Sequence, residues 1–142
     1  MTGINNWITH LTKNHVSIFP LVVFRIIFGI LRFFSTLRFI LKGWVHDLYE
    51  VPTYFFTYYG FDWVSPLPAP FMYVLFILLL IACIFIIFGL FYRTNTVLFF
   101  LIFTYVELID KTNYLNHYYF ISLISLLLIL LPANSYFSLD TY

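Results

Sequence analysis

The chain has 142 residues, of which 63% are hydrophobic, 24% aromatic and only 9% charged, and its formal net charge is +1. About a quarter of the residues of a soluble domain are normally charged, so this composition excludes a soluble or a disordered protein. Lipid is therefore the solvent expected around most of the protein surface. The nearly neutral charge offers no basic face to nucleic acid.

The first residues of the chain form a polar tail. Residues 1–17 are polar and mixed, and they contain no apolar core followed by a small-residue cleavage site. We therefore expect a polar N-terminal tail over 1–17 and a first membrane segment that is not cleaved.

The first apolar segment covers residues 18–41 and carries Arg25, Arg32 and Arg38. Arg25 and Arg32 are seven residues apart, so they share one face of a helix. An arginine near the bilayer centre is costly and seldom faces lipid. This face is therefore expected to turn toward other helices or toward a wet cavity.

The three arginines have different expected environments. Arg25 lies in the middle of the segment, and we expect it inside the bundle, paired with a hydrogen-bond acceptor or with a carboxylate. Glu107 and Asp110 are the carboxylates available at membrane depth. For Arg32 and Arg38 the simpler interpretation is that their side chains extend to an interface.

Three further apolar spans follow. The clearest is 71–92, which carries no charge and is long enough to cross a hydrocarbon core of roughly 30 Å. Residues 94–110 and 117–131 are shorter, and either both cross the membrane or they form one re-entrant hairpin. We favour an all-α integral membrane protein with about four transmembrane helices, over 18–41, 71–92, 94–110 and 117–131.

Residues 42–70 form the one long connection, and they are rich in tryptophan, tyrosine and phenylalanine. Such rings favour the headgroup region of a membrane, so we expect an interfacial segment with a short helix. Basic residues divide almost evenly between the two sides, so the positive-inside rule does not orient the chain. The expected location is the bacterial inner membrane, or the endoplasmic reticulum if the source is eukaryotic.

The most informative polar stretch is 104–117, TYVELIDKTNYLNH. If one helix continues through it, Glu107, Asp110, Lys111 and Tyr114 share one face at spacings of three and four residues. Ionisable residues inside a membrane are candidates for a functional site by default. Asn113, Asn116 and His117 follow as a second set at helical spacing.

A structural interpretation of these residues stays open. Glu107, Asp110 and Lys111 can form an ion-pair cluster that caps a helix end at the interface. A lone histidine such as His117 is more often a hydrogen-bonded interface residue than a catalyst. No metal site is expected, because the four histidines have no paired spacing and Cys83 is the one cysteine.

The segment IDKTNYLNHYYF at 109–120 resembles the signature of the vitamin K-dependent gamma-glutamyl carboxylases. These enzymes belong to the wider horizontally transferred transmembrane (HTTM) domain proteins. Three other segments agree with the family in order and spacing, and the resemblance covers about 16–140. They are PLVVFRIIFG at 20–29, FGLFYRTNTVLFFL at 88–101 and LLPANSYFSLD at 130–140.

This resemblance implies a peptidyl-glutamate carboxylase that uses reduced vitamin K, a hydroquinone, as its cofactor. In that chemistry the deprotonated hydroquinone reacts with oxygen, and the strong base so formed removes a gamma proton from a peptide glutamate. Carbon dioxide then adds to the carbanion, and the quinone leaves as its epoxide. The family's catalytic lysine falls on Lys111, and Asn116 and His117 match the polar positions that orient the quinone or the base.

Members of this family continue through further membrane helices and a large globular region that handles the peptide. The resemblance therefore implies that this chain is the N-terminal membrane part of a longer protein. Two other interpretations stay open. One is a non-catalytic HTTM-type module that binds a lipid or a quinone or supports assembly, and the other is a small structural membrane protein.

Overall fold

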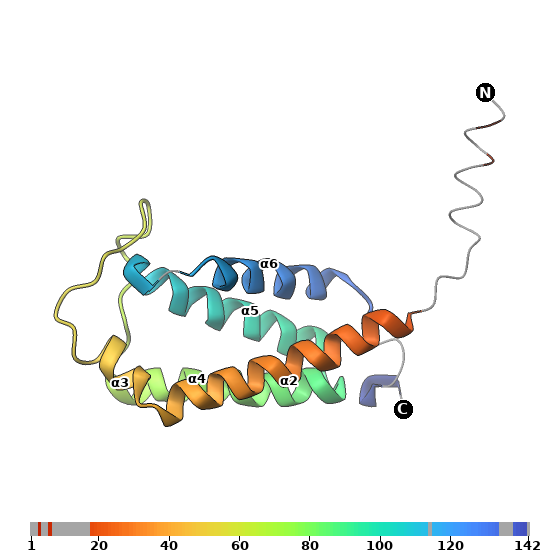
Figure 1. The fold of residues 1–142 in the computed structure, drawn as a ribbon, viewed down its shortest axis with the longest axis horizontal. Coiled ribbons are helices and arrows are strands. Elements are labelled where there is room, and N and C mark those ends of the chain that lie inside the picture. The colour runs from red at the N-terminus through yellow and green to blue at the C-terminus, as the bar shows by residue number, and fades with distance from the viewer. Residues whose placement is uncertain (1–2, 4–5, 7–17, 114, 134–137, 142) are drawn as a thin grey trace.

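The computed structural model describes residues 3, 6, 18–113, 115–133 and 138–141, and within them every regular element is helical. Most of the predicted tail therefore lies outside the described residues. Four long helices form a bundle (Figure 1), and three short elements lie at its ends. The long helices are α2 (Phe19–Leu41), α4 (Ala69–Phe88), α5 (Tyr92–Ile109) and α6 (Asn116–Leu130). The short elements are α3 (Trp44–Tyr49), η1 (Lys111–Asn113) and η2 (Leu139–Thr141).

Neighbouring helices pack in the order α2, α4, α5 and α6. One end of the bundle carries α3, the connection 50–68 and η1, and we call it the loop end (Figure 1). The opposite end carries the junction between α4 and α5 together with η2, and we call it the junction end.

Proline and glycine set several helix boundaries. Pro20 lies in the first turn of α2, and Pro70 lies in the first turn of α4, where the missing N–H group costs nothing. Gly89 ends α4 with a left-handed φ of 68°. Gly29 lets α2 approach α4, because a Cβ atom there would lie 2.6 Å from Ile87 Cγ1.

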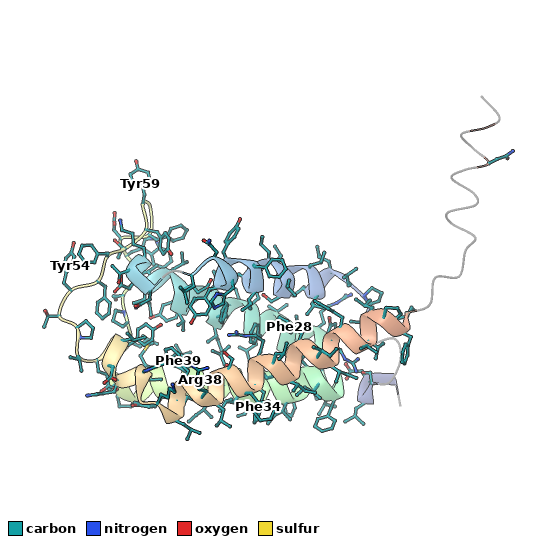
Figure 2. The ribbon with its side chains drawn as sticks, viewed as in Figure 1. Phe28, Phe34, Arg38, Phe39, Tyr54 and Tyr59 are labelled. Atoms are coloured by element: carbon teal, nitrogen blue, oxygen red, sulfur yellow. The ribbon has the colours of Figure 1, made fainter. Side chains whose placement is uncertain are left out.

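Apolar side chains cover both the inside and the outside of this bundle. Phe28 is buried and packs against Phe99 of α5, whereas Phe34 on the same helix points outward and is 61% exposed (Figure 2). Large apolar side chains are exposed along all four long helices. An outer surface of this kind is suited to lipid and unsuited to water.

Two of the four predicted membrane spans meet the requirements of length and hydropathy. These are α2, with 23 residues, and α4, with 20 residues. The other two helices do not meet both requirements: α5 has 18 residues but too low a hydropathy, because it includes polar residues such as Arg93 and Glu107, and α6 has only 15 residues. At 1.5 Å per residue they are about 27 Å and about 22 Å long, below the roughly 30 Å of a hydrocarbon core.

No single helix continues through 104–117, in agreement with the expected spans over 94–110 and 117–131. Helix α5 ends at Ile109, and Asp110 is extended, with φ −144° and ψ 115°. The Asp110 carboxylate accepts hydrogen bonds from the backbone N–H and the hydroxyl of Thr112, at 2.9 and 2.8 Å. This local bonding competes with the helix and favours a turn. The expected shared face is therefore absent, and Tyr114 lies outside the described residues.

The aromatic connection lies beside this turn at the loop end. The Lys111 backbone N–H donates to Phe56 O at 2.8 Å, and Tyr105 donates its hydroxyl proton to Ser65 O. Tyr54 and Tyr59 project outward from the connection (Figure 2). The short helix expected in this segment is α3.

Candidate functional site

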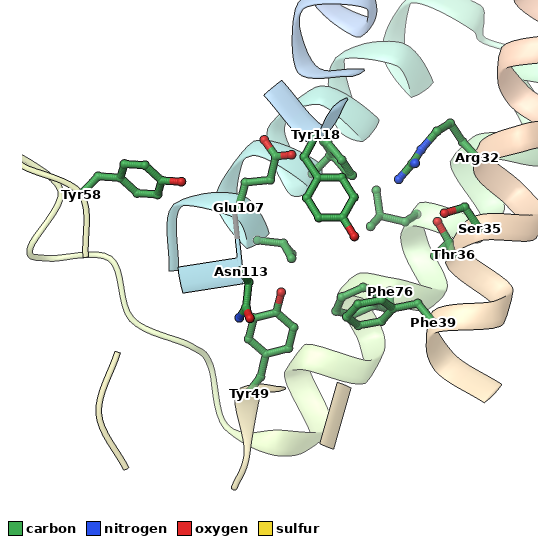
Figure 3. A pocket seen from close by; sticks show the side chains of 13 residues that line it. Arg32, Ser35, Thr36, Phe39, Tyr49, Tyr58, Phe76, Glu107, Asn113 and Tyr118 are labelled. Carbon is green, nitrogen blue, oxygen red and sulfur yellow. The ribbon is translucent and has the colours of Figure 1, made fainter. Parts of the chain in front are cut away.

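A small polar cavity lies inside the loop end, with a volume of about 70 Å³. By size it has room for a few water molecules. The stacked rings of Phe39 and Phe76 form one wall (Figure 3). The polar side chains that line the cavity are Arg32, Ser35, Thr36, Tyr49, Tyr58, Glu107, Asn113 and Tyr118.

Arg32 points into this polar cavity (Figure 3). Its guanidinium carbon lies 4.7 Å from the centre of the Phe103 ring, a cation–π contact. The buried Nε atom of Arg32 has no hydrogen-bond partner among the described residues. Its charge interacts electrostatically with Glu107, but the two groups do not form an ion pair within 4.0 Å.

Tyr49 of α3 contributes a hydroxyl group to the same cavity (Figure 3). Burial, and to a lesser extent the nearby Tyr118, Asp110 and Glu107, raise the pKa of the Tyr49 phenol. The phenol therefore stays protonated and available as a hydrogen-bond donor throughout the neutral range.

A larger cavity of about 350 Å³ lies between α5 and α6. Its wall is mostly apolar and is formed by Phe100, Leu108, Tyr119, Leu123 and Leu126, together with the polar residues Tyr58, Thr104, Glu107 and Ser122. An apolar cavity of about 150 Å³ already holds a benzene-sized ring, so this one has room for a larger ring. Glu107 and Tyr58 line both cavities and therefore mark the boundary between them.

Polar groups of α5 lie unsatisfied at this boundary. Glu107 Oε2 accepts a hydrogen bond from the Ser122 hydroxyl at 2.8 Å, but its other oxygen, Oε1, is buried without a partner in the described part of the chain. The Thr104 hydroxyl, one turn earlier, is also buried without one. Thr96 on the same helix instead donates to Tyr92 O at 2.7 Å. A buried polar group left unpaired costs about 1–3 kcal/mol, so these two atoms point to a bound water or ligand.

The sequence-predicted catalytic residues lie beside the cavities and do not line them. Lys111, Asn116 and His117 are all exposed. The His117 ring packs edge-on against Tyr118, with the ring centres 4.5 Å apart. The motif reaches the polar cavity through Asn113 and Tyr118.

The ion-pair cluster considered for the polar stretch does not form. The one ion pair within 4.0 Å in the described part of the chain joins His46 and Glu50 at 2.5 Å. Asp110 is buried, and its carboxylate accepts a hydrogen bond from Thr112 within the same turn. The Glu107 carboxylate is bonded to Ser122.

Sequence reasoning missed the hydroxyl groups around Glu107. Thr104 and Ser122 look ordinary in apolar helices, where such residues commonly bond to their own backbone. The one available signal was the spacing of Thr104 and Glu107, which are three residues apart and lie on one face of a helix.

Arg25 lies at the junction end, away from this site. Its side chain is fully buried and donates to Ala133 O at 2.7 Å and, more weakly, to Ile87 O at 3.4 Å. The carboxylate that interacts with it electrostatically is Asp140. Glu107 and Asp110, the two carboxylates expected as its partners, are bonded elsewhere.

Asp140 also holds the start of α5. Its two carboxylate oxygens accept the backbone N–H groups of Phe91 and Tyr92, at 2.7 and 2.8 Å. Phe91 has a left-handed φ of 44°, which is rare for a residue other than glycine. Arg25, Phe91, Tyr92, Ala133 and Asp140, which belong to the three other segments that carried the resemblance, therefore meet at the junction end.

No group of three or more histidine, cysteine, aspartate or glutamate side chains that can hold a metal ion occurs among the residues that the structure describes. No solved structure matches the chain. The model of one protein family, the HTTM domain, matches residues 14–142, which is nearly the whole chain. With its two membrane-type helices and its apolar outer surface, the chain belongs to the HTTM domain family of membrane proteins.

Proposed function

We propose that this chain is the N-terminal membrane part of a vitamin K-dependent gamma-carboxylase-like protein. In this proposal all four long helices cross the bilayer, with α5 and α6 as a pair of short spans. The loop end binds the ring of a reduced quinone. Lys111 acts as the base, and Asn116 and His117 support it.

The observation that carries the proposal is the position of the Asp-Lys-Thr-Asn turn. This turn joins α5 to α6, and residues next to it line both cavities, Asn113 and Tyr118 the polar one and Tyr119 the apolar one. Lys111 itself is exposed on this turn, and a lysine is suited to proton removal, because its amine can lose its charge whereas a guanidinium cannot.

The proposed four crossings are supported by the aromatic loop end. A polar turn between two short spans needs a place outside the hydrocarbon core. The Lys111 backbone is bonded to Phe56 in a connection rich in aromatic residues, which is the composition of a headgroup region.

The test uses the product of the complete open reading frame that carries these residues, purified with lipid. Epoxide formation from reduced vitamin K is followed with a glutamate-containing peptide present. We expect turnover by the unchanged protein and none by Lys111→Ala, with partial recovery on adding a small amine. Lys111→Arg should stay inactive, because guanidinium remains protonated. Near-normal epoxidation by Lys111→Ala would overturn the role of Lys111.

A second candidate function is a non-catalytic module that binds a quinone or another lipid. The exposure of Lys111, Asn116 and His117, none of which lines a cavity, favours it. Binding of the reduced quinone without any epoxide from the unchanged protein would select this candidate.

A further inference from the structure

We propose that Thr104 and Glu107 form a hydroxyl-binding site at the inner end of the cavity between α5 and α6, and that its ligand is a flat apolar ring bearing a hydroxyl group. This inference rests on the proposed function for the location of the ligand. It goes further by naming the two side chains that recognise the ligand and the chemical group that they recognise.

The two side chains offer complementary hydrogen bonds. A hydroxyl group donates one hydrogen bond and accepts others. Glu107 Oε1 is a free acceptor, and the Thr104 hydroxyl is a donor with no partner among the described residues. Because the two residues lie one turn apart on α5 and line the same cavity, one ligand hydroxyl can satisfy both.

The neighbouring contacts hold the acceptor in place. The Ser122 hydroxyl donates to Glu107 Oε2 at 2.8 Å, which leaves Oε1 for the ligand. Across the boundary, Arg32 interacts electrostatically with Glu107 but forms no ion pair with it, so Arg32 does not occupy Oε1.

The rest of the cavity selects the body of the ligand. Its remaining wall is formed largely by phenylalanine and leucine side chains, and its volume is about 350 Å³. A charged or strongly polar molecule would lose its hydration there without compensation. A ring with an apolar body and one hydroxyl edge fits both parts of the lining.

The test compares two probes of the same ring system, 1-naphthol and 1-methoxynaphthalene, in which a methyl group replaces the hydroxyl proton and removes the hydrogen-bond donor. Binding to the chain in lipid nanodiscs is measured by calorimetry, with empty nanodiscs subtracted. We expect 1-naphthol to bind about tenfold or more tightly, since a hydrogen bond to a charged group has about that effect. Neither probe can form an epoxide by the proposed reaction, so the outcome does not depend on turnover.

Two variants locate this preference, and a third serves as their control. Glu107→Leu removes the acceptor and should bring the affinity ratio close to one. Thr104→Val keeps the side-chain shape but removes a donor that the oxygen of either probe can accept from, so it should weaken the binding of both probes alike. Thr96→Val removes a hydroxyl from the same helix outside both cavities and should keep both affinities. Equal binding of the two probes by the unchanged chain would overturn the inference, and so would unchanged affinities for both probes in Thr104→Val, even if Glu107→Leu failed to fold.

Discussion

Arg25 and Arg32 lie two turns apart on one face of α2, yet the structure uses them differently. At the junction end, the guanidinium of Arg25 is bonded to two backbone carbonyls and lies near Asp140. At the loop end, Arg32 faces a cavity, and its guanidinium makes a cation–π contact with Phe103 and no hydrogen bond within the described part of the chain. The same residue type on the same helix thus has a structural environment at one end and a binding environment at the other.

The surrounding groups show the same difference. At the junction end, Ser138 donates to Gly89 O, Asp140 binds two backbone N–H groups, and the Tyr92 hydroxyl donates to Leu128 O at 2.7 Å. At the loop end, Thr104 and Glu107 each keep a buried oxygen without a partner among the described residues. Paired buried groups hold a fold together, whereas unpaired ones are tolerated where a ligand or water completes them.

The largest expected effect is that of Arg25→Leu. Removal of the guanidinium leaves the carbonyls of Ala133 and Ile87 unsatisfied and Asp140 without a compensating charge, so we expect a loss of about 3–5 kcal/mol in the free energy of unfolding. Denaturation in a mild detergent measures it. Arg38→Leu is the matched control, because Arg38 is exposed beside the Trp44 ring, and its loss should stay below about 1 kcal/mol. Equal losses of unfolding free energy in the two variants would show that the buried Arg25 stabilises the fold no more than the exposed Arg38 does.

A smaller effect is expected for Gly89→Ala at the junction end. Gly89 has φ 68°, and an added Cβ would meet Ser138 and lie 2.9 Å from Arg25 Nη1. The left-handed backbone and this crowding should together cost about 1–3 kcal/mol. Gly43 has φ 72° and open space around it, so Gly43→Ala isolates the backbone contribution. If both variants lost equal stability, the contact of Ser138 with Gly89 would be dispensable.

The sequence predicted the apolar helices well and their connections poorly. Uninterrupted hydrophobicity after a run of prolines placed the start of α4 within two residues, at Ala69 against the expected 71, whereas Gly89 ends the helix at Phe88, before the expected end at 92. The break after residue 110 was expected from the bounds of the spans, but the bonding of Asp110 to Thr112 was not, because a side chain competing with the helix for backbone N–H groups leaves no mark on hydrophobic periodicity.

The candidate site was predicted only in part, for a similar reason. Glu107 was recognised because a charge stands out in an apolar segment, but Thr104 and Ser122 do not stand out there. Arg25 was expected inside the bundle, yet its charged neighbour, Asp140, comes from the far end of the chain. Long-range pairing of this kind depends on the tertiary arrangement, which local sequence patterns do not specify.

The most direct test of the difference between the two ends is the unfolding free energy of the ligand-free Arg32→Leu protein, measured in the same detergent as Arg25→Leu. Arg32 is desolvated and makes no hydrogen bond within the described part of the chain, whereas Arg25 bonds to two backbone carbonyls, so removal of Arg32 also relieves a desolvation cost. The account predicts a stability within about 1 kcal/mol of the unchanged protein or above it. A loss as large as that of Arg25→Leu would contradict the account, because Arg32 would then support the fold as Arg25 does.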